Sequence, residues 1–122
     1  MSWTVLLVDE FKAEFDVLAP AVQNELAARA RALEQFGPNL GRPMVDTLKG
    51  SRHMNMKELR FRAAKGVWRV AFAFDPRRQA ILLVAGDKSG TDADRFYSLL
   101  IRRADARFDA FLIRQAAEIG GR

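Results

Sequence analysis

Four side chains between residues 60 and 97 have the chemistry to cleave a phosphodiester bond without a metal ion. They are Arg60, Arg69, Lys88 and Tyr97. Arginine offers a planar, bidentate match to phosphate, and lysine carries a compact charge that burial can shift toward neutrality. Tyrosine can stack on a base or transfer a proton. On RNA, such groups can promote attack of the ribose 2′-hydroxyl on the adjacent phosphate while the cations stabilise the developing charge.

Other common chemistries lack their residues. His53 is the only histidine and there is no cysteine, so we expect no metal site and no metal-binding motif is present. The glycine-containing segment 86–90 is too short for a phosphate-binding loop and lacks the Walker pattern. A nucleophile elbow for serine catalysis is also missing. We therefore expect a protein without metal or cofactor.

Two neighbouring strands are expected to position the arginines. Residues 57–62 alternate apolar and charged side chains, whereas 67–74 place large apolar residues at even positions and Arg69 among small odd ones. The two apolar sets face one core only if paired positions sum to an odd number. The turn at 64–66 then places Arg69 opposite either Arg60 or Arg62.

Either register collects three arginines on one solvent-facing patch floored by alanines. Like charges directly opposite each other are destabilising, so this convergence indicates an anion site. The alternative is a solvated face on which the arginines fan apart and contact Glu58 or the acids of a helix.

The remaining chain predicts the elements that surround this strand pair. They are a strand at 3–8, a helix capped by Asp9, a helix at 20–36, a long loop at 37–56, a strand at 79–85 and a helix at 92–118. Because three consecutive strands are linked by short turns, this β-α-α-β-β-β-α order favours a mainly antiparallel α+β sheet packed against helices, with a basic open face. The length predicts a single domain over residues 1–122.

The net charge of +5 is unevenly distributed. Residues 49–90 hold ten basic and three acidic side chains, a net charge of +7, so the rest of the chain carries −2. No segment is long and apolar enough to cross a bilayer, and the N-terminus does not resemble a signal peptide. We expect a cytoplasmic protein that does not contact membranes. We also expect it to carry a localised anion-binding surface.

A family resemblance rests on several short motifs in order along the chain. They are Leu48-Lys49-Gly50-Ser51, Lys57-Glu58-Leu59-Arg60, Trp68-Arg69-Val70-Ala71-Phe72, Gly86-Asp87-Lys88 and Arg95-Phe96-Tyr97. In this combination the sequence resembles the RelE/HigB-type toxins of bacterial toxin–antitoxin modules, most closely the phage-derived HigB-like branch. The resemblance spans essentially the whole chain and implies the small RelE-like fold.

The resemblance also implies roles for individual residues. Arg60 and Arg69 would bind phosphate and stabilise the transition state. Lys88 would stabilise charge or transfer a proton, and Tyr97 would stack on a base or act as general base. Further candidates for contacts with the RNA phosphates are Lys57, Arg62, Lys65 and His53, and His53 would alternatively act as an acid.

By the same resemblance, the expected function is cleavage of messenger RNA on the ribosome, which inhibits translation. The expected partners are mRNA, the ribosome and a cognate helix-turn-helix antitoxin, through which the complex would bind operator DNA indirectly. Two alternatives remain open from the sequence. One is a non-catalytic poison of a protein target such as DNA gyrase, as in the ParE-type relatives, and the other is an inactive remnant that only binds an antitoxin or nucleic acid.

Overall fold

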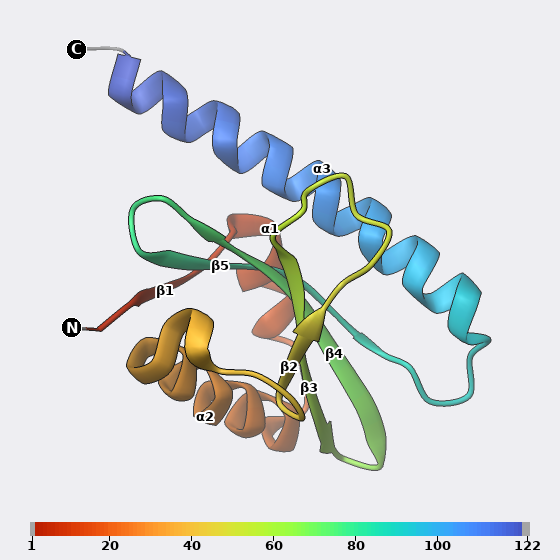
Figure 1. Ribbon diagram of the computed structural model, residues 1–122. Coiled ribbons are helices and arrows are strands. Elements are labelled where there is room, and N and C mark those ends of the chain that lie inside the picture. Colours follow the sequence, from red (N-terminus) through yellow and green to blue (C-terminus); the bar gives the residue numbers. More distant parts are fainter. Residues whose placement is uncertain (1, 121–122) are drawn as a thin grey trace.

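The computed structural model describes residues 2–120, which form one mixed sheet with helices on both faces (Figure 1). The elements in chain order are β1 (Thr4–Leu7), α1 (Asp9–Phe15), α2 (Pro20–Phe36), the short 3₁₀ helix η1 (Gly37–Asn39), β2 (Val45–Thr47), β3 (Met56–Ala63), β4 (Gly66–Asp75), β5 (Gln79–Asp87) and α3 (Ala93–Gly120). The strands lie in the order β1-β5-β4-β3-β2.

The sheet confirms the expected α+β class. Strands β2 to β5 pair antiparallel in succession, and only β1 runs parallel to its neighbour β5. The expected element order lacked β2, which lies within the predicted loop 37–56 and pairs with residues 57–59 of β3. Three residues are too few to show an alternating pattern, so the pairing partner rather than the local sequence defines this strand.

The helix boundaries are set by residues near their ends. The prediction that Asp9 caps the first helix is wrong, because Val8 occupies the N-cap and Asp9 lies in the first turn. Val8 already has extended backbone angles as the chain leaves β1, and its carbonyl accepts the N–H of Lys12. At the last helix, the Asp92 carboxylate accepts the N–H of Arg95 at 3.0 Å, as an N-terminal cap does.

Both faces of the sheet are covered. α1 and α2 pack on the face that carries Phe72, and α3 packs across β4 and β5 on the opposite face (Figure 1). Ala71 and Ala73 are fully buried on this second face. The expectation of an open basic face is therefore wrong for its β4 part, since small side chains there allow α3 to approach closely.

Candidate functional site

Three arginines converge at one end of the sheet, as predicted. Arg60 of β3 pairs directly with Arg69 of β4, which selects the first of the two expected registers. Arg60, Arg62 and Arg69 line one open hollow together with the ring of Pro43. Arg60 is partly exposed and Arg62 is exposed, so these two offer accessible guanidinium groups.

The expectation that Arg69 faces solvent is wrong, because this residue is only 6% exposed. Its Nε donates to the Tyr97 hydroxyl oxygen at 3.1 Å and lies 3.7 Å from a carboxylate oxygen of Glu58. Its Nη1 donates to the backbone carbonyl of Trp68 at 3.0 Å. The first turns of α3, which carry Tyr97, account for this burial.

Tyr97 reaches the sheet and connects two charged groups. Its hydroxyl accepts the hydrogen bond from Arg69 and donates one to Glu58 Oε1 at 2.9 Å. Glu58 is 6% exposed and lies two residues before Arg60, with its side chain on the same face of β3. Tyr97 and Glu58 also line a second hollow with residues 46–49, so the hydroxyl lies at a surface-accessible edge.

The surroundings of Glu58 and Tyr97 raise the pKa values of both side chains. Burial raises the pKa of Glu58, and hydrogen bonding to Tyr97 and the charge of Arg69 only partly oppose it. Burial also raises the pKa of the Tyr97 phenol, which the hydrogen bond from Arg69 lowers in part. Tyr97 is therefore a neutral phenol near pH 7, and Glu58 is the group of the pair that can take a proton.

Lys88 lies beside this pair at the end of β5. Its backbone N–H donates to the carbonyl of Val67 at 2.7 Å, which fixes the residue against β4. Its Nζ lies 5.9 Å from the centre of the Tyr97 ring. Arg60, Arg69, Lys88 and Tyr97 are thus brought to one region, although their catalytic roles stay predictions.

The further candidates Lys57 and His53 lie apart from this region, whereas Lys65 lies in the turn next to the arginine hollow. Lys57 alternates onto the opposite face of β3 from Arg60, and Lys65 is exposed at the tip of the β3–β4 turn. His53 contacts Asp109 Oδ1 at 2.7 Å. Because Asp109 follows Tyr97 by twelve residues on α3, His53 is held about 18 Å farther along the helix axis.

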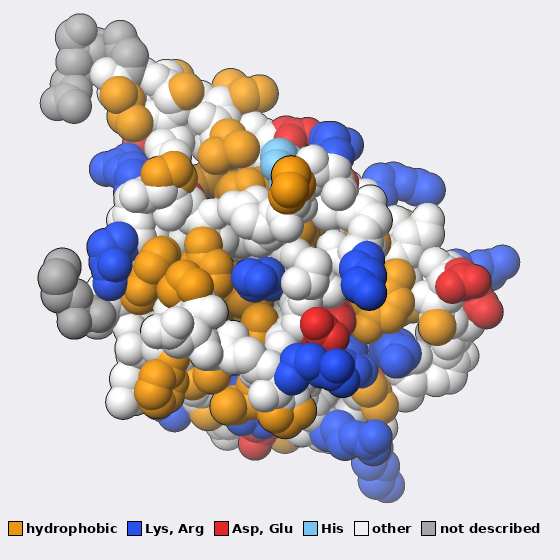
Figure 2. Space-filling view, in the orientation of Figure 1, with side chains coloured by type: hydrophobic (Ala, Val, Ile, Leu, Met, Phe, Trp, Pro, Cys, Tyr) orange, Lys and Arg blue, Asp and Glu red, His pale blue; other side chains and the backbone are white. Residues whose placement is uncertain are grey.

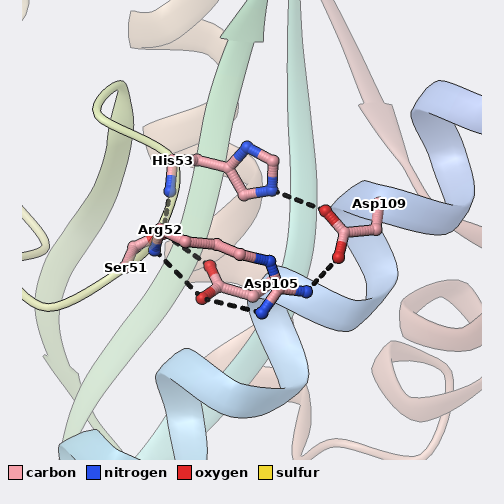
Figure 3. A network of polar contacts seen from close by, with 5 residues as sticks. All are labelled: Ser51, Arg52, His53, Asp105 and Asp109. Carbon is pink, nitrogen blue, oxygen red and sulfur yellow. Dashed lines mark hydrogen bonds and ion pairs between the residues drawn. The ribbon is translucent and has the colours of Figure 1, made fainter.

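His53 belongs to a polar network that the sequence did not indicate (Figure 3). In it, Ser51 Oγ and the backbone N–H of Arg52 donate to Asp105, and the Arg52 guanidinium pairs with Asp109. Asp105 is only 5% exposed. The network fastens the loop before β3 to the middle of α3, and His53 takes part in it through Asp109.

Glu58 is the residue whose role at the site the sequence reasoning missed. It appeared only as a partner acid among the arginines, although it is part of the Lys57-Glu58-Leu59-Arg60 motif. A glutamate on the face shared with Arg60 was the available signal, because a lone acid among bases is well placed to exchange protons.

The surface around β2 is strongly basic. Figure 2 shows Lys and Arg side chains gathered around a small acidic patch over this part of the molecule. Asp46 of β2 lies 3.7 Å from Arg60 and 3.8 Å from Arg42. In residues 2–120, no three His, Cys, Asp or Glu side chains are grouped as metal ligands. No helix in the same residues combines the length and apolar character of a membrane span.

Comparisons with known proteins agree with this architecture. The model of the family described as phage-derived protein Gp49-like (DUF891) matches residues 13–109. HigB3, a toxin-named protein of Mycobacterium tuberculosis, is 42% identical over 117 residues, which are 96% of this chain and 97% of HigB3. HigB2 of the same organism, also named as a toxin, is 50% identical over 82 residues, which are 66% of this chain but only 40% of HigB2.

Among solved structures, a double mutant of the Escherichia coli toxin RelE in the free state is similar. It aligns with a TM-score of 0.61 at 14% identity over 84% of this chain and 98% of RelE. This similarity concerns the fold, and the matches to the Gp49-like family and to HigB3 extend over most of the chain. The chain therefore belongs to the phage-derived Gp49-like family and is a RelE/HigB-type toxin homologue.

Proposed function

We propose that this protein is the toxin of a toxin–antitoxin module and cleaves messenger RNA by attack of a ribose 2′-hydroxyl on the adjacent phosphate. One observation carries the proposal: the arginine-lined hollow lies directly beside the Glu58–Tyr97 pair, with Arg69 touching both. A phosphate-binding surface and a proton acceptor thus adjoin each other, as this reaction requires.

The arginines bind the scissile phosphate in this mechanism. Arg60 and Arg62 are accessible and can contact phosphate oxygens as bidentate donors. Arg69 is held by Glu58, Tyr97 and the Trp68 carbonyl, so it adds a fixed positive charge at the base of the hollow. Fixed charges stabilise a transition state well because they need no reorganisation during the reaction.

Proton transfer runs through the phenol. The 2′-hydroxyl gives its proton to Tyr97 Oη while the Tyr97 proton passes to Glu58, and the 2′ oxygen forms a bond to phosphorus. The bond from phosphorus to the 5′ oxygen breaks, and the Lys88 ammonium supplies the proton that this oxygen takes up. The products are a 2′,3′-cyclic phosphate and a 5′-hydroxyl, so atoms and charges balance.

The test is induction of the chain in bacteria, followed by growth measurement and mapping of new RNA 5′ ends. We expect growth arrest and new 5′-hydroxyl ends within coding regions, in phase with codons if the RNA is cut on the ribosome. Tyr97→Phe, Lys88→Ala and Arg60→Ala should each lose cleavage by at least about tenfold, since each removes a proton-transfer or charge-stabilising group. Lys12→Ala removes an equal charge from exposed α1 and should stay toxic.

Two results would contradict the proposal. Full cleavage by the folded Tyr97→Phe and Lys88→Ala variants would reject the site. Growth arrest with DNA damage and without new RNA ends would favour a poison of DNA gyrase instead, and harmless overexpression would indicate an inactive remnant.

The partners belong to the same proposal. The expected partners are an antitoxin with a helix-turn-helix domain, mRNA and the ribosome, in the cytoplasm, with operator DNA bound through the antitoxin. Support comes from the toxin names of the two mycobacterial relatives. Co-expression of the product of the adjacent open reading frame should restore growth if that product is the antitoxin.

A further inference from the structure

The carboxyl-terminal half of β5 lacks a strand neighbour on one side within residues 2–120. β1 pairs with residues 79–82 of β5 and then ends, whereas β5 continues to Asp87. The N–H of Lys88 points to β4, where it bonds the Val67 carbonyl. Because backbone groups alternate along a strand, Ala85 and Asp87 direct their N–H and C=O groups to the side that β1 has left.

An apolar hollow of about 240 Å³ adjoins this strand edge. Residues 84–87 form one wall, and α3 forms the other with Phe96, Leu99 and Leu100. Leu99 is 43% exposed, so it offers apolar surface at the rim of the hollow. Gly86 has no side chain, and this lets the Phe96 ring approach the strand closely. A Cβ at this position would lie only 2.9 Å from the ring.

Two cations border the same hollow. Arg95 and Arg103 both line it and are exposed on α3, and their eight-residue separation corresponds to about 12 Å along the helix. Asp87, the acid of the hollow, is already engaged by the N–H groups of Val67 and Ser89. The charges that remain for a ligand at this edge are those of Arg95 and Arg103. They favour acidic side chains in a partner.

The Leu83 carbonyl already accepts from Arg107 of α3, so the free part of this edge is residues 85–87. We propose that an extended, acidic peptide segment of a partner protein binds here as an additional strand beside residues 85–87. Its backbone would pair with Ala85 and Asp87, one apolar side chain would fill the hollow against Leu99, and carboxylates would face Arg95 and Arg103. A partner strand explains all three observations, because it alone uses an open strand edge, an apolar slot and flanking cations together. The surface does not use the side chains assigned to RNA cleavage.

The test is an NMR titration of the full chain with an acetylated heptapeptide, Thr-Glu-Thr-Val-Thr-Glu-Thr. Its two glutamates lie about 13 Å apart in an extended strand, close to the spacing of the two arginines. We expect saturable shifts and slowed hydrogen exchange at the Ala85 and Asp87 amides. Leu99→Ser and Arg103→Glu should each weaken binding at least about tenfold.

Matched controls keep this test decisive. Arg102→Glu makes the same charge change on the neighbouring exposed residue of α3 and should bind nearly as well as the parent. The same peptide with alternate backbone amides methylated should not bind, because it cannot form strand hydrogen bonds. Absence of binding, equal binding of the methylated peptide, or equal effects of the Arg102 and Arg103 variants would overturn the proposal. Preferential shifts of these amides by single-stranded RNA would overturn it as well.

Discussion

The Tyr97 hydroxyl lies between a guanidinium and a carboxylate, and this position limits its chemistry. It accepts from Arg69 and donates to Glu58, and the pKa values of both Tyr97 and Glu58 are raised by burial. A phenolate would be a poor general base here, because it would have to form near a carboxylate. A neutral phenol that passes its proton to Glu58 avoids this cost.

At neutral pH and below, we predict that RNA cleavage follows the ionisation of Glu58. The rate should rise with pH, with a midpoint above the usual value for glutamate, because burial raises this pKa and only the carboxylate accepts the proton. Loss of the Tyr97 phenol proton should affect the rate only above the ordinary tyrosine range. The measurement is kcat/KM against pH on a short RNA.

Glu58→Gln should abolish this rising limb and lower the plateau by about 10²-fold or more. Asp46→Asn is the comparison variant, since Asp46 contacts Arg60 but lies outside the proposed proton path. Because the charge of Asp46 helps to raise the Glu58 pKa, this variant should keep the rising limb and move its midpoint to lower pH. An unchanged pH profile in the Gln variant would reject the role of Glu58.

At the level of elements, α3 decides the site because it carries Tyr97 and covers Arg69. The network of Ser51, Arg52 and His53 with Asp105 and Asp109 fastens this helix to the loop before β3 (Figure 3). The helix position at the site therefore depends on contacts about 12 to 18 Å away along its axis.

Asp105→Ala should destabilise the protein by about 1–3 kcal/mol, because it leaves Ser51 Oγ and the Arg52 N–H without their buried acceptor. Urea denaturation measures the change. Asp109→Ala should cost less, since Asp109 is more exposed. Hydrogen bonding from Arg52 lowers the pKa of Asp109, so its contribution is present at neutral pH and is lost as pH falls through that lowered pKa. Equal losses in the two variants would contradict this assignment.

Gly37 ends α2 in a conformation that an L side chain rarely adopts, with φ of 53°. A Cβ at this position would lie 2.3 Å from Trp3 Nε1. Gly37→Ala should therefore lower the free energy of unfolding by more than about 2 kcal/mol. Gly41→Ala, where a Cβ meets nothing within 4 Å, should change it by less than about 0.5 kcal/mol. Thermal unfolding of the two variants measures both changes. Similar losses of stability in Gly37→Ala and Gly41→Ala would contradict the prediction.

At the scale of the whole molecule, two accessible arginines of the basic central segment lie together in one hollow. The segment 49–90 has a net charge of +7, and α3 covers the β4 part of the face that carries its sheet arginines. Arg60 and Arg62 stay accessible at the hollow, whereas Arg77 and Arg78 are exposed at the β4–β5 turn, at the other end of these strands. This arrangement predicts RNA binding that weakens steeply with salt.

Arg60→Ala and Arg62→Ala should each reduce the slope of log affinity against log salt by about 0.7, the value for one phosphate contact on a single strand. Fluorescence anisotropy with a 2′-O-methyl RNA, which cannot be cleaved by 2′-hydroxyl attack, measures binding alone. Lys12→Ala should leave the slope unchanged, because it lies on exposed α1. A slope that falls equally in all three variants would mean that the RNA has no localised site.

The sequence by itself determined the α+β class, the helix and hairpin positions and the opposition of Arg60 and Arg69. These features follow from local periodicity, because a one-residue slip of β3 on β4 would turn every apolar side chain to the wrong face. The short strand β2 carried no such pattern and could not be predicted in this way.

Only the tertiary structure decided what the arginines contact. The bonds from Tyr97 to Arg69 and Glu58 join residues 28 and 39 positions apart. Whether such residues meet depends on how α3 packs over the small side chains Ala71 and Ala73, and on the distant network that fastens the helix. The periodicity of one element specifies which face it buries but not which distant residue will lie against that face. The burial of Arg69, the contacts of Glu58 and the position of His53 beside Asp109 are therefore set by packing.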